Sequence, residues 1–449
     1  MRGQRSVSVP RDNRLRFLGA LGGLLLMLAA GCTPVEPLQN YWSLEPLYTG
    51  PTVRIRIFQQ FEVTRARFDL SDGALVLCDE AGTPLPRPAQ SRHVYVSLQD
   101  QQVAVAFEPG PEAARAAPRY SKIWVKSGDG RLVFIKLSVP ELNIRRNYEG
   151  GGIEVSVKYG RLAFVNQLPL ELYLARVLPS EMDPEHFTTE ALKAQVVVAR
   201  TWALKNLSRH GRFGYNFCDA THCQVYKGRF LVSRRAERAV KETLGEVLAY
   251  QGHLAEAFYH STCGGNTAYV HEVWGGQAVP YLSRVEDRWS PDNRPYCSHS
   301  PFSTWTILTS LYRLQRLMKN NHWLCADEEL QDVKVDWVNF SGRVQRILLV
   351  SNLRTKVVSE ENFRRLLNQD FGKSKILSKF YTIAVEGQQF KLSGRGLGHG
   401  VGLCQWGARG MAQYGFGYPE ILKHYFQGTS LAGRYGRPAS TENSPTTTP

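Results

Sequence analysis

Residues 188–207 read TTEALKAQVVVARTWALKNL. Either threonine at the start can cap a helix, and the glutamate that follows favours a first turn. The segment is apolar nearly all round, which predicts a helix buried at the centre of a domain. Gln195 and Arg200 are polar positions in that helix, so each must find partners inside the protein.

Strand-like runs precede and follow this predicted helix. Short alternating segments separated by turn residues fill the chain from about residue 39 to 147, and two more follow three glycines. The predicted strands are Val53–Phe58, Val94–Val96, Val103–Phe107, Leu132–Ile135, Ile153–Val157 and Leu162–Val165. Strands and helices alternating irregularly around one buried helix indicate an α+β fold with a mixed sheet. We predict an N-terminal β-rich domain over residues 33–148 and a catalytic domain over residues 149–430.

The second half of the larger domain is more mixed. A helix is predicted from Ser233 to Leu244 and a strand from Glu246 to Tyr250. Residues 302–387, with a predicted helix from Thr306 to Met318 and a strand from Val344 to Val350, are interpreted as an inserted subdomain. Residues 431–449 are rich in Ser, Thr and Pro near their end, which predicts a disordered tail.

Composition limits the class of protein. With 449 residues, 43% hydrophobic and 11% aromatic, the chain is long and apolar enough for several domains and is not disordered throughout. The net charge of +15 favours an anionic partner without choosing one. After the N-terminus, no apolar run is long enough to span a bilayer.

The first 32 residues predict an export signal. Five arginines precede an uncharged run from Phe17 to Ala30, and Gly31 and Cys32 follow. Fourteen apolar residues are short for a membrane span. The segment before Cys32 resembles a bacterial lipobox, which makes Cys32 the candidate lipidation site. We therefore expect an exported, lipid-anchored protein of the periplasm or cell envelope, a location that argues against nucleic acid as the partner.

The sequence LPSEMDP, residues 178–184, carries the first candidate catalytic group, Glu181. It reads as a turn-rich loop that leads into the buried helix. A glutamate held near apolar groups has a raised pKa and can act as a general acid near neutral pH. The alternative is an ordinary solvated glutamate on a loop.

The sequence CDATHC, residues 218–223, is the second candidate site. Cys218, His222 and Cys223 suit zinc, and His210 is a candidate fourth ligand. A local disulfide or a buried cysteine pair beside a hydrogen-bonded histidine explains the same residues. Seven cysteines remain after Cys32, and an odd number cannot all pair within one chain.

Two glycine-bearing segments complete the candidate sites. The run from Phe258 to Gly265 ends in paired glycines and is followed by Trp274, a pattern that suits a sugar-binding groove and also ordinary structural turns. No nucleophile elbow surrounds Ser261 there. In residues 394–402, glycine occupies every second position, which lets a ligand or another backbone approach one face.

Taken in order, these segments resemble the stage II sporulation protein D family, a group of peptidoglycan lytic transglycosylases that includes amidase-enhancer proteins. The matching motifs are LPSEM (178–182), EALKAQ (190–195), ARTWA (199–203), THCQVY (221–226), GHGVG (398–402), QWGA (405–408) and ILKHY (421–425). The resemblance covers about residues 149–428. Departures from the family are Cys263 and Cys404, where serine is commoner, and Trp202 and Trp406, where tyrosine is commoner.

The resemblance implies cleavage of the β-1,4 bond between N-acetylmuramic acid (MurNAc) and N-acetylglucosamine (GlcNAc), giving 1,6-anhydroMurNAc ends. Glu181 matches the family's catalytic glutamate and works as the single acid and base, so no cofactor is required for catalysis. Arg200 and Gln195 are assigned to substrate binding, as are Tyr259, His260 and His399. Zinc at the cysteine–histidine motif is then structural.

The implied partners are peptidoglycan glycan strands and an N-acetylmuramoyl-L-alanine amidase that strips their peptides beforehand, in wall remodelling, division or sporulation. The alternative function is a non-catalytic module that binds glycan and stimulates such an amidase.

Overall fold

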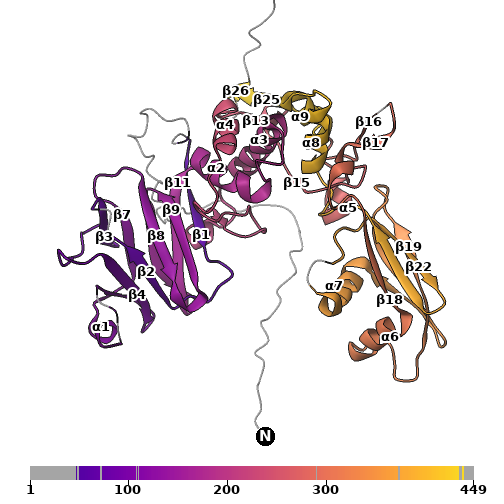
Figure 1. Cartoon of the computed structure of the whole chain (residues 1–449), viewed down its shortest axis with the longest axis horizontal. Helices are drawn as coiled ribbons and strands as arrows, with labels where there is room; N and C mark the ends of the chain where they lie inside the picture. Colours follow the sequence, from indigo (N-terminus) through magenta and orange to yellow (C-terminus); the bar gives the residue numbers. More distant parts are fainter. Residues whose placement is uncertain are drawn as a thin grey trace, which may run out of the picture. The chain divides into compact units, whose positions relative to one another are not determined.

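The computed structural model describes residues 47–438, apart from gaps at 48–49, 71–72, 108, 110, 290, 373–374 and 434–436. The predicted export signal, Cys32 and residues 439–449 of the predicted tail lie outside the described residues. Helices and strands are mixed along the chain, which confirms the α+β class (Figure 1). Within the described ranges, no helix combines the length and apolarity needed to cross a bilayer.

Two six-stranded sheets form the first part of the fold. The first contains, in spatial order, β12 (Phe217–Cys218), β1 (Thr52–Ile57), β11 (Arg161–Pro169), β10 (Gly152–Lys158), β7 (Lys122–Ser127) and β3 (Leu75–Asp79). The second contains β6 (Arg119–Tyr120), β5 (Gln102–Ala106), β4 (His93–Gln99), β2 (Arg65–Asp69), β8 (Val133–Val139) and β9 (Ile144–Gly150). Short helices α1 (Pro111–Ala116) and η2 (Pro140–Leu142) connect strands. All six predicted strands of this region are observed.

The first sheet crosses the domain boundary that we predicted at residue 148. β1 pairs antiparallel with β11, so that Val53 lies opposite Leu168, and β7 pairs with β10. The three glycines at 150–152 are therefore the crossing from one sheet to the other rather than a linker. A Cβ on Gly150, whose φ is +146°, would lie 2.1 Å from the carbonyl oxygen of Gln167. Only glycine permits that approach.

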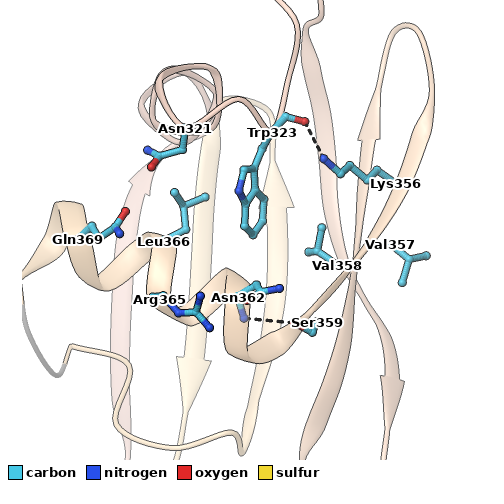
Figure 2. A pocket seen from close by; sticks show the side chains of 10 residues that line it. All are labelled: Asn321, Trp323, Lys356, Val357, Val358, Ser359, Asn362, Arg365, Leu366 and Gln369. Carbon is cyan, nitrogen blue, oxygen red and sulfur yellow. Dashed lines mark hydrogen bonds between the residues drawn. The ribbon is translucent and has the colours of Figure 1, made fainter. Parts of the chain in front are cut away.

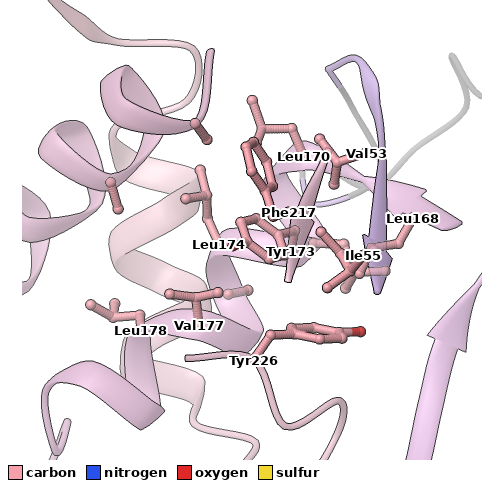
Figure 3. Packing of buried hydrophobic residues seen from close by; sticks show 14 of the residues in the cluster. Val53, Ile55, Leu168, Leu170, Tyr173, Leu174, Val177, Leu178, Phe217 and Tyr226 are labelled. Carbon is pink, nitrogen blue, oxygen red and sulfur yellow. The ribbon is translucent and has the colours of Figure 1, made fainter. Parts of the chain in front are cut away.

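A group of helices follows the sheets. It contains α2 (Leu170–Glu181), α3 (Thr189–Lys205), α4 (Arg234–Glu242), α8 (Gln405–Gln413) and α9 (Tyr418–Tyr425). α3 contacts all four of the others and is buried along most of its length, which confirms the predicted central helix. The Thr188 hydroxyl accepts a hydrogen bond from the Ala191 amide and caps the start of α3. Figure 3 shows Tyr173 and Leu174 of α2 packed beside Ile55 and Phe217 of the first sheet.

Short strands and turns join the helices. They are η3 (Gly211–Phe213), β13 (Val247–Tyr250), β14 (His253–Leu254), β15 (Tyr259–His260), α5 (Val270–Trp274), β16 (Arg288–Trp289), β17 (Arg294–Pro295), η4 (Tyr296–His299), β24 (Leu403–Cys404), β25 (Ser430–Gly433) and β26 (Arg437–Pro438). β25 pairs with β13. β26 pairs with β25 in turn, so the predicted disordered tail is wrong for residues 431–433 and 437–438, whose backbone belongs to this sheet.

Residues 305–394 form a unit with a hydrophobic core of its own, from Leu311 to Leu392. One sheet contains β18 (Trp305–Ser310), β23 (Gln389–Gly394) and β22 (Tyr381–Glu386), and the other contains β19 (Leu330–Val338), β20 (Val344–Ser351) and β21 (Thr355–Ser359). Helices α6 (Leu311–Asn320) and α7 (Glu360–Phe371) complete it. The predicted limits of 302–387 leave out β23, which pairs with both β18 and β22.

The helix predicted from Thr306 to Met318 is wrong in its first half. Residues 305–310 alternate between half-buried and exposed side chains and form β18. Ser310 then caps α6 by accepting a hydrogen bond from the Arg313 amide, at 3.1 Å. Pairing with β23, which lies far away in the sequence, determines the strand, and local periodicity does not contain that information.

Candidate active site

Glu181 is the last residue of α2, not part of a loop as predicted. Ten of the twelve residues of α2 are buried, and this packing holds the helix together across Pro179, which lacks an amide hydrogen. The chain turns to an extended conformation at Met182, whose amide bonds the carbonyl of Leu178 at 2.9 Å. The Glu181 carboxyl is thus carried on a rigid, buried element.

The surroundings of Glu181 favour its protonated form. Burial raises the pKa of this carboxyl above its usual value, and three weaker influences oppose the change. The Val225 amide donates a hydrogen bond to Oε1 at 2.8 Å, the Tyr259 side chain forms another, and the charge of Lys227 acts nearby. Glu181 therefore keeps its proton to a higher pH than an exposed glutamate, as a general acid requires.

Tyr259 and His260 form β15, which pairs in parallel with β24. The pKa of the Tyr259 hydroxyl is raised, mainly by burial and next by the charge of Glu181, so this hydroxyl stays neutral beside the carboxyl. The structure therefore brings together Glu181 and Tyr259, two of the residues selected from the sequence.

His260 follows Tyr259 in β15 and its ring lies against that of His399, with ring centres 5.5 Å apart, while the His399 side chain bonds the backbone of Tyr259. Burial lowers the pKa of both imidazoles, to about 4 for His399. His260 Nδ1 lies 3.1 Å from the carbonyl oxygen of Val401, while its buried Nε2 has no hydrogen-bond partner among the described residues. Near neutral pH, both rings are therefore uncharged hydrogen-bonding groups.

Trp274 extends the same cluster. Its ring lies 4.9 Å from that of His399 and 4.8 Å from that of Phe258, and 52% of the residue remains exposed. An exposed tryptophan whose ring packs against other rings is held in place and can stack on the apolar face of a sugar. We use the name Glu181 cluster below for Glu181 and its neighbour Tyr259 together with His260, His399 and Trp274, whose rings contact one another and which are connected to Tyr259 through its backbone bond with His399.

Arg200 does not belong to the Glu181 cluster, which corrects its assignment to substrate binding. Its guanidinium makes two hydrogen bonds with Glu171 of α2, at 2.8 and 2.6 Å, and both side chains are fully buried. A third bond, of 3.1 Å, reaches the carbonyl oxygen of Glu246. Arg200 thus joins α3 to α2 inside the core and is inaccessible to a glycan.

Gln195 is likewise buried, with 1% exposure. Its Oε1 lies 3.5 Å from Gln405 Nε2 in α8, and its own Nε2 has no hydrogen-bond partner among the described residues. The structure therefore places Gln195 between helices, and its assignment to substrate binding stays a prediction.

The four predicted metal ligands lie together. One donor atom from each of His210, Cys218, His222 and Cys223 falls within 4.8 Å of the others. Cys223 Sγ is 3.4 Å from His210 Nε2 and 3.6 Å from His222 Nδ1. Two thiols and two imidazoles at these separations fit the tetrahedral donor set that zinc prefers.

A cavity of about 550 Å³ lies elsewhere, in the unit with the separate core. Figure 2 shows Trp323, Val358 and Leu366 lining it, with Lys356 bonded to the carbonyl oxygen of Trp323. None of the residues of the Glu181 cluster lines this cavity.

Sequence reasoning missed the residues that fix the position and the pKa of Glu181 from neighbouring elements. Glu171 and the run around it, LELYLARVL (170–178), carried a helical signal that the following proline obscured. The Val225 amide and the charge of Lys227 follow the cysteine–histidine motif directly, but contact with Glu181 depends on the tertiary fold.

Comparison with known proteins connects this geometry to a family. A family model described as "Stage II sporulation protein" matches residues 158–250, and one described as a domain of unknown function matches residues 296–402. The first match contains Glu181 and all four predicted metal ligands, and the second coincides with the unit that has its own core.

Three relatives are similar over about 60% of the chain. An uncharacterized protein of Brachyspira hyodysenteriae is 32% identical over 61% of this chain and 72% of its own length. The amidase enhancer of Bacillus subtilis is 31% identical over 58% of this chain, which spans 40% of that relative. Stage II sporulation protein D of Bacillus subtilis is 28% identical over 60% of this chain and 76% of its own length.

Proposed function

The chain belongs to the stage II sporulation protein D family, and from this premise we propose that it is a peptidoglycan lytic transglycosylase. A role at the cell wall agrees with the family. The proposed substrate is a glycan strand whose stem peptides have been removed, and the proposed product carries a 1,6-anhydroMurNAc end.

In the proposed reaction, the Glu181 carboxyl donates its proton to the oxygen that leaves with GlcNAc. The C6 hydroxyl of MurNAc attacks the anomeric carbon, and the resulting carboxylate takes the hydroxyl proton. The carboxyl is regenerated and no water is consumed. One carboxyl group therefore suffices, whereas most glycoside hydrolases use two.

The observation that carries the proposal is the setting of Glu181. Burial raises the pKa of the carboxyl. In the described part of the chain, the groups that lower it are the Val225 amide, the Tyr259 side chain and the charge of Lys227. No second carboxylate is among them. A half-buried acid that has Tyr259 beside it and no carboxylate partner supports an internal nucleophile supplied by the substrate.

The pH dependence of cleavage tests the role of Tyr259. Its hydrogen bond stabilises the carboxylate and lowers the pKa of Glu181, so Tyr259→Phe raises that pKa. Because Glu181 acts first in its protonated form, the alkaline limb of the activity profile shifts to higher pH in this variant. Tyr312→Phe, at an exposed position in α6, is the control and leaves the profile unchanged. An identical limb in Tyr259→Phe would contradict the assignment.

The second candidate function is enhancement of an N-acetylmuramoyl-L-alanine amidase without cleavage, since one relative is named amidase enhancer. The two are separated by measuring peptide release by a purified amidase in the presence of Glu181→Gln. A catalytic role predicts that stimulation is lost together with strand cleavage. Stimulation equal to that of the unaltered protein would favour the enhancer function.

We also propose that His210, Cys218, His222 and Cys223 hold a structural zinc ion. Four protein donors leave no position open for substrate, and when bound the ion supplies cross-linking rather than chemistry. The same backbone segment continues to Val225, so the ion would hold the amide that bonds Glu181. Cys218→Ser/Cys223→Ser is expected to lose the zinc ion of this site, one per chain, and on the order of several kcal/mol of unfolding free energy, measured by metal analysis and denaturant titration. Equal stability with and without a chelator would contradict this role.

The proposed location is the cell envelope. It rests on the family and on the sequence of the leader, with attachment to the membrane through lipid on Cys32. The proposed partners are peptidoglycan strands and an amidase that acts before this protein.

A further inference from the structure

A second group of metal-binding side chains lies in the core, apart from the four residues discussed above. It consists of Cys263, Asp287, Cys297 and Cys404, all fully buried, with one donor atom of each within 4.8 Å of the others. We propose that these four residues bind a zinc-type divalent cation, and we name them the Cys3Asp site.

The distances fit a single ion. Two thiolates bound to one tetrahedral zinc at ~2.3 Å lie ~3.8 Å apart. Cys263 Sγ and Cys297 Sγ are 3.6 Å apart, and Cys263 Sγ is 2.9 Å from Asp287 Oδ2. Three sulfur donors and one carboxylate oxygen in a closed arrangement suit zinc better than calcium or magnesium, which prefer oxygen ligands.

Backbone amides already point at the sulfur atoms. The Cys263 amide donates to Cys404 Sγ at 3.2 Å, and the Gly407 amide donates to the same sulfur at 3.2 Å. The Gly265 amide donates to Cys263 Sγ at 3.3 Å. Such contacts orient and stabilise metal-bound thiolates. Cys404 also caps the start of α8, where the helix dipole favours a negative charge.

Asp287 is also oriented by neighbouring groups, which contact its second carboxylate oxygen. The Tyr425 hydroxyl donates a hydrogen bond to Oδ1, and His424 Nε2, a buried nitrogen without a hydrogen-bond partner among the described residues, lies 3.9 Å from that oxygen. A Cβ on Gly407 would come within 2.8 Å of both carboxylate oxygens, so glycine leaves room for Asp287 at the start of α8.

Charge compensation supports a bound cation. Burying a carboxylate and thiolates at one point is costly unless positive charge accompanies them, whereas neutral thiols bury readily. In the described ranges, the basic group recorded within 4.0 Å of Asp287 is His424, at 3.9 Å, and its imidazole carries a charge only when it is protonated. Arg343 lies near Cys263, but its guanidinium donates to backbone carbonyl oxygens, including those of Cys263 and Asn266. A divalent ion would supply the compensation directly.

The position of the Cys3Asp site indicates its role. Cys297 and Cys404 flank the unit with its own core, one on each side. Cys263 follows β15, which carries Tyr259 and His260, and Cys404 lies in β24, its partner strand. The ion would therefore fasten both ends of this unit to the strands that hold part of the Glu181 cluster.

Metal analysis of variants tests the proposal. Cys218→Ser/Cys223→Ser removes the thiol ligands of the first site, and we expect it to keep about one zinc ion per chain after purification in zinc-containing buffer. Adding Cys297→Ser reduces the content to about zero. Cys325→Ser is the matched control, because that thiol is exposed and belongs to neither group of donor atoms, and it leaves the content unchanged.

A second measurement tests the proposal even if the variant with Cys297→Ser does not fold. Asp287→Asn in the same double-cysteine background keeps the side-chain size, and it should weaken zinc binding at least about tenfold in competition with a chromogenic chelator. The proposal is overturned if Cys218→Ser/Cys223→Ser contains no zinc, or if Asp287→Asn binds zinc as tightly as its parent. Mass mapping that finds two of Cys263, Cys297 and Cys404 joined as a disulfide would also overturn it.

Discussion

Glu181→Gln should lower the rate of glycan cleavage by about 10²- to 10⁴-fold, the range expected when a general acid is lost. Glutamine preserves the size of the side chain and can still accept the hydrogen bond from the Val225 amide through its carbonyl oxygen. It has no proton to donate to the leaving oxygen. Initial rates on peptide-free strands, measured from released fragments, provide the comparison.

Glu185→Gln is the matched control for this substitution. Glu185 lies four residues away on the segment after α2, and it is exposed. The Glu185→Gln variant loses one carboxylate, as Glu181→Gln does, but the change lies outside the Glu181 cluster. Its cleavage rate should therefore equal that of the unaltered protein. Binding of strands to Glu181→Gln, followed by co-sedimentation, should persist. A Glu181→Gln variant that cleaves at the full rate would remove Glu181 from the mechanism.

The second large effect concerns stability. Arg200→Met should lower the free energy of unfolding by about 3–5 kcal/mol, because it leaves the Glu171 carboxylate buried without its guanidinium. The pair lies between α2 and α3, both side chains are 0% exposed, and two hydrogen bonds join them. Denaturant titration followed by circular dichroism measures the loss.

Arg238→Met provides the comparison for the buried pair. Arg238 pairs with Glu242 on the outer face of α4, and 73% of its side chain is exposed. Exposed pairs of this kind contribute about 0–1 kcal/mol. Arg200→Met/Glu171→Leu, which removes both charges, should recover part of the loss. Equal effects of Arg200→Met and Arg238→Met would contradict the structural role assigned to Arg200.

Much of the fold was predictable because local pattern and tertiary packing agree. The apolar run of α3, its threonine cap and the alternating strands β1, β5 and β10 each carry their own period. Prediction and structure disagree where residues far away in the sequence determine the secondary structure. β18 exists because it pairs with β23, and α2 passes through Pro179 because ten of its residues are buried.

The candidate site was predictable only in part, for a related reason. Glu181, Tyr259, His260 and His399 were selected by motif, and the structure brings Glu181 to Tyr259 and His260 to His399. Arg200 was also selected by motif. Its hydrogen-bond partner Glu171 lies 29 residues earlier in the sequence, and the pair is buried in the core. The Cys3Asp site draws residues from positions 263 to 404, and no local spacing could reveal it.

The most direct test of the proposed function is the mass of the products formed from peptide-free glycan strands by the purified protein. A lytic transglycosylase yields disaccharides with 1,6-anhydroMurNAc ends, one water lighter than the products of hydrolysis, and Glu181→Gln does not form them. Products with ordinary reducing ends would contradict the single-carboxyl mechanism. Intact strands that remain bound to the protein would contradict cleavage altogether and leave enhancement of an amidase as the function.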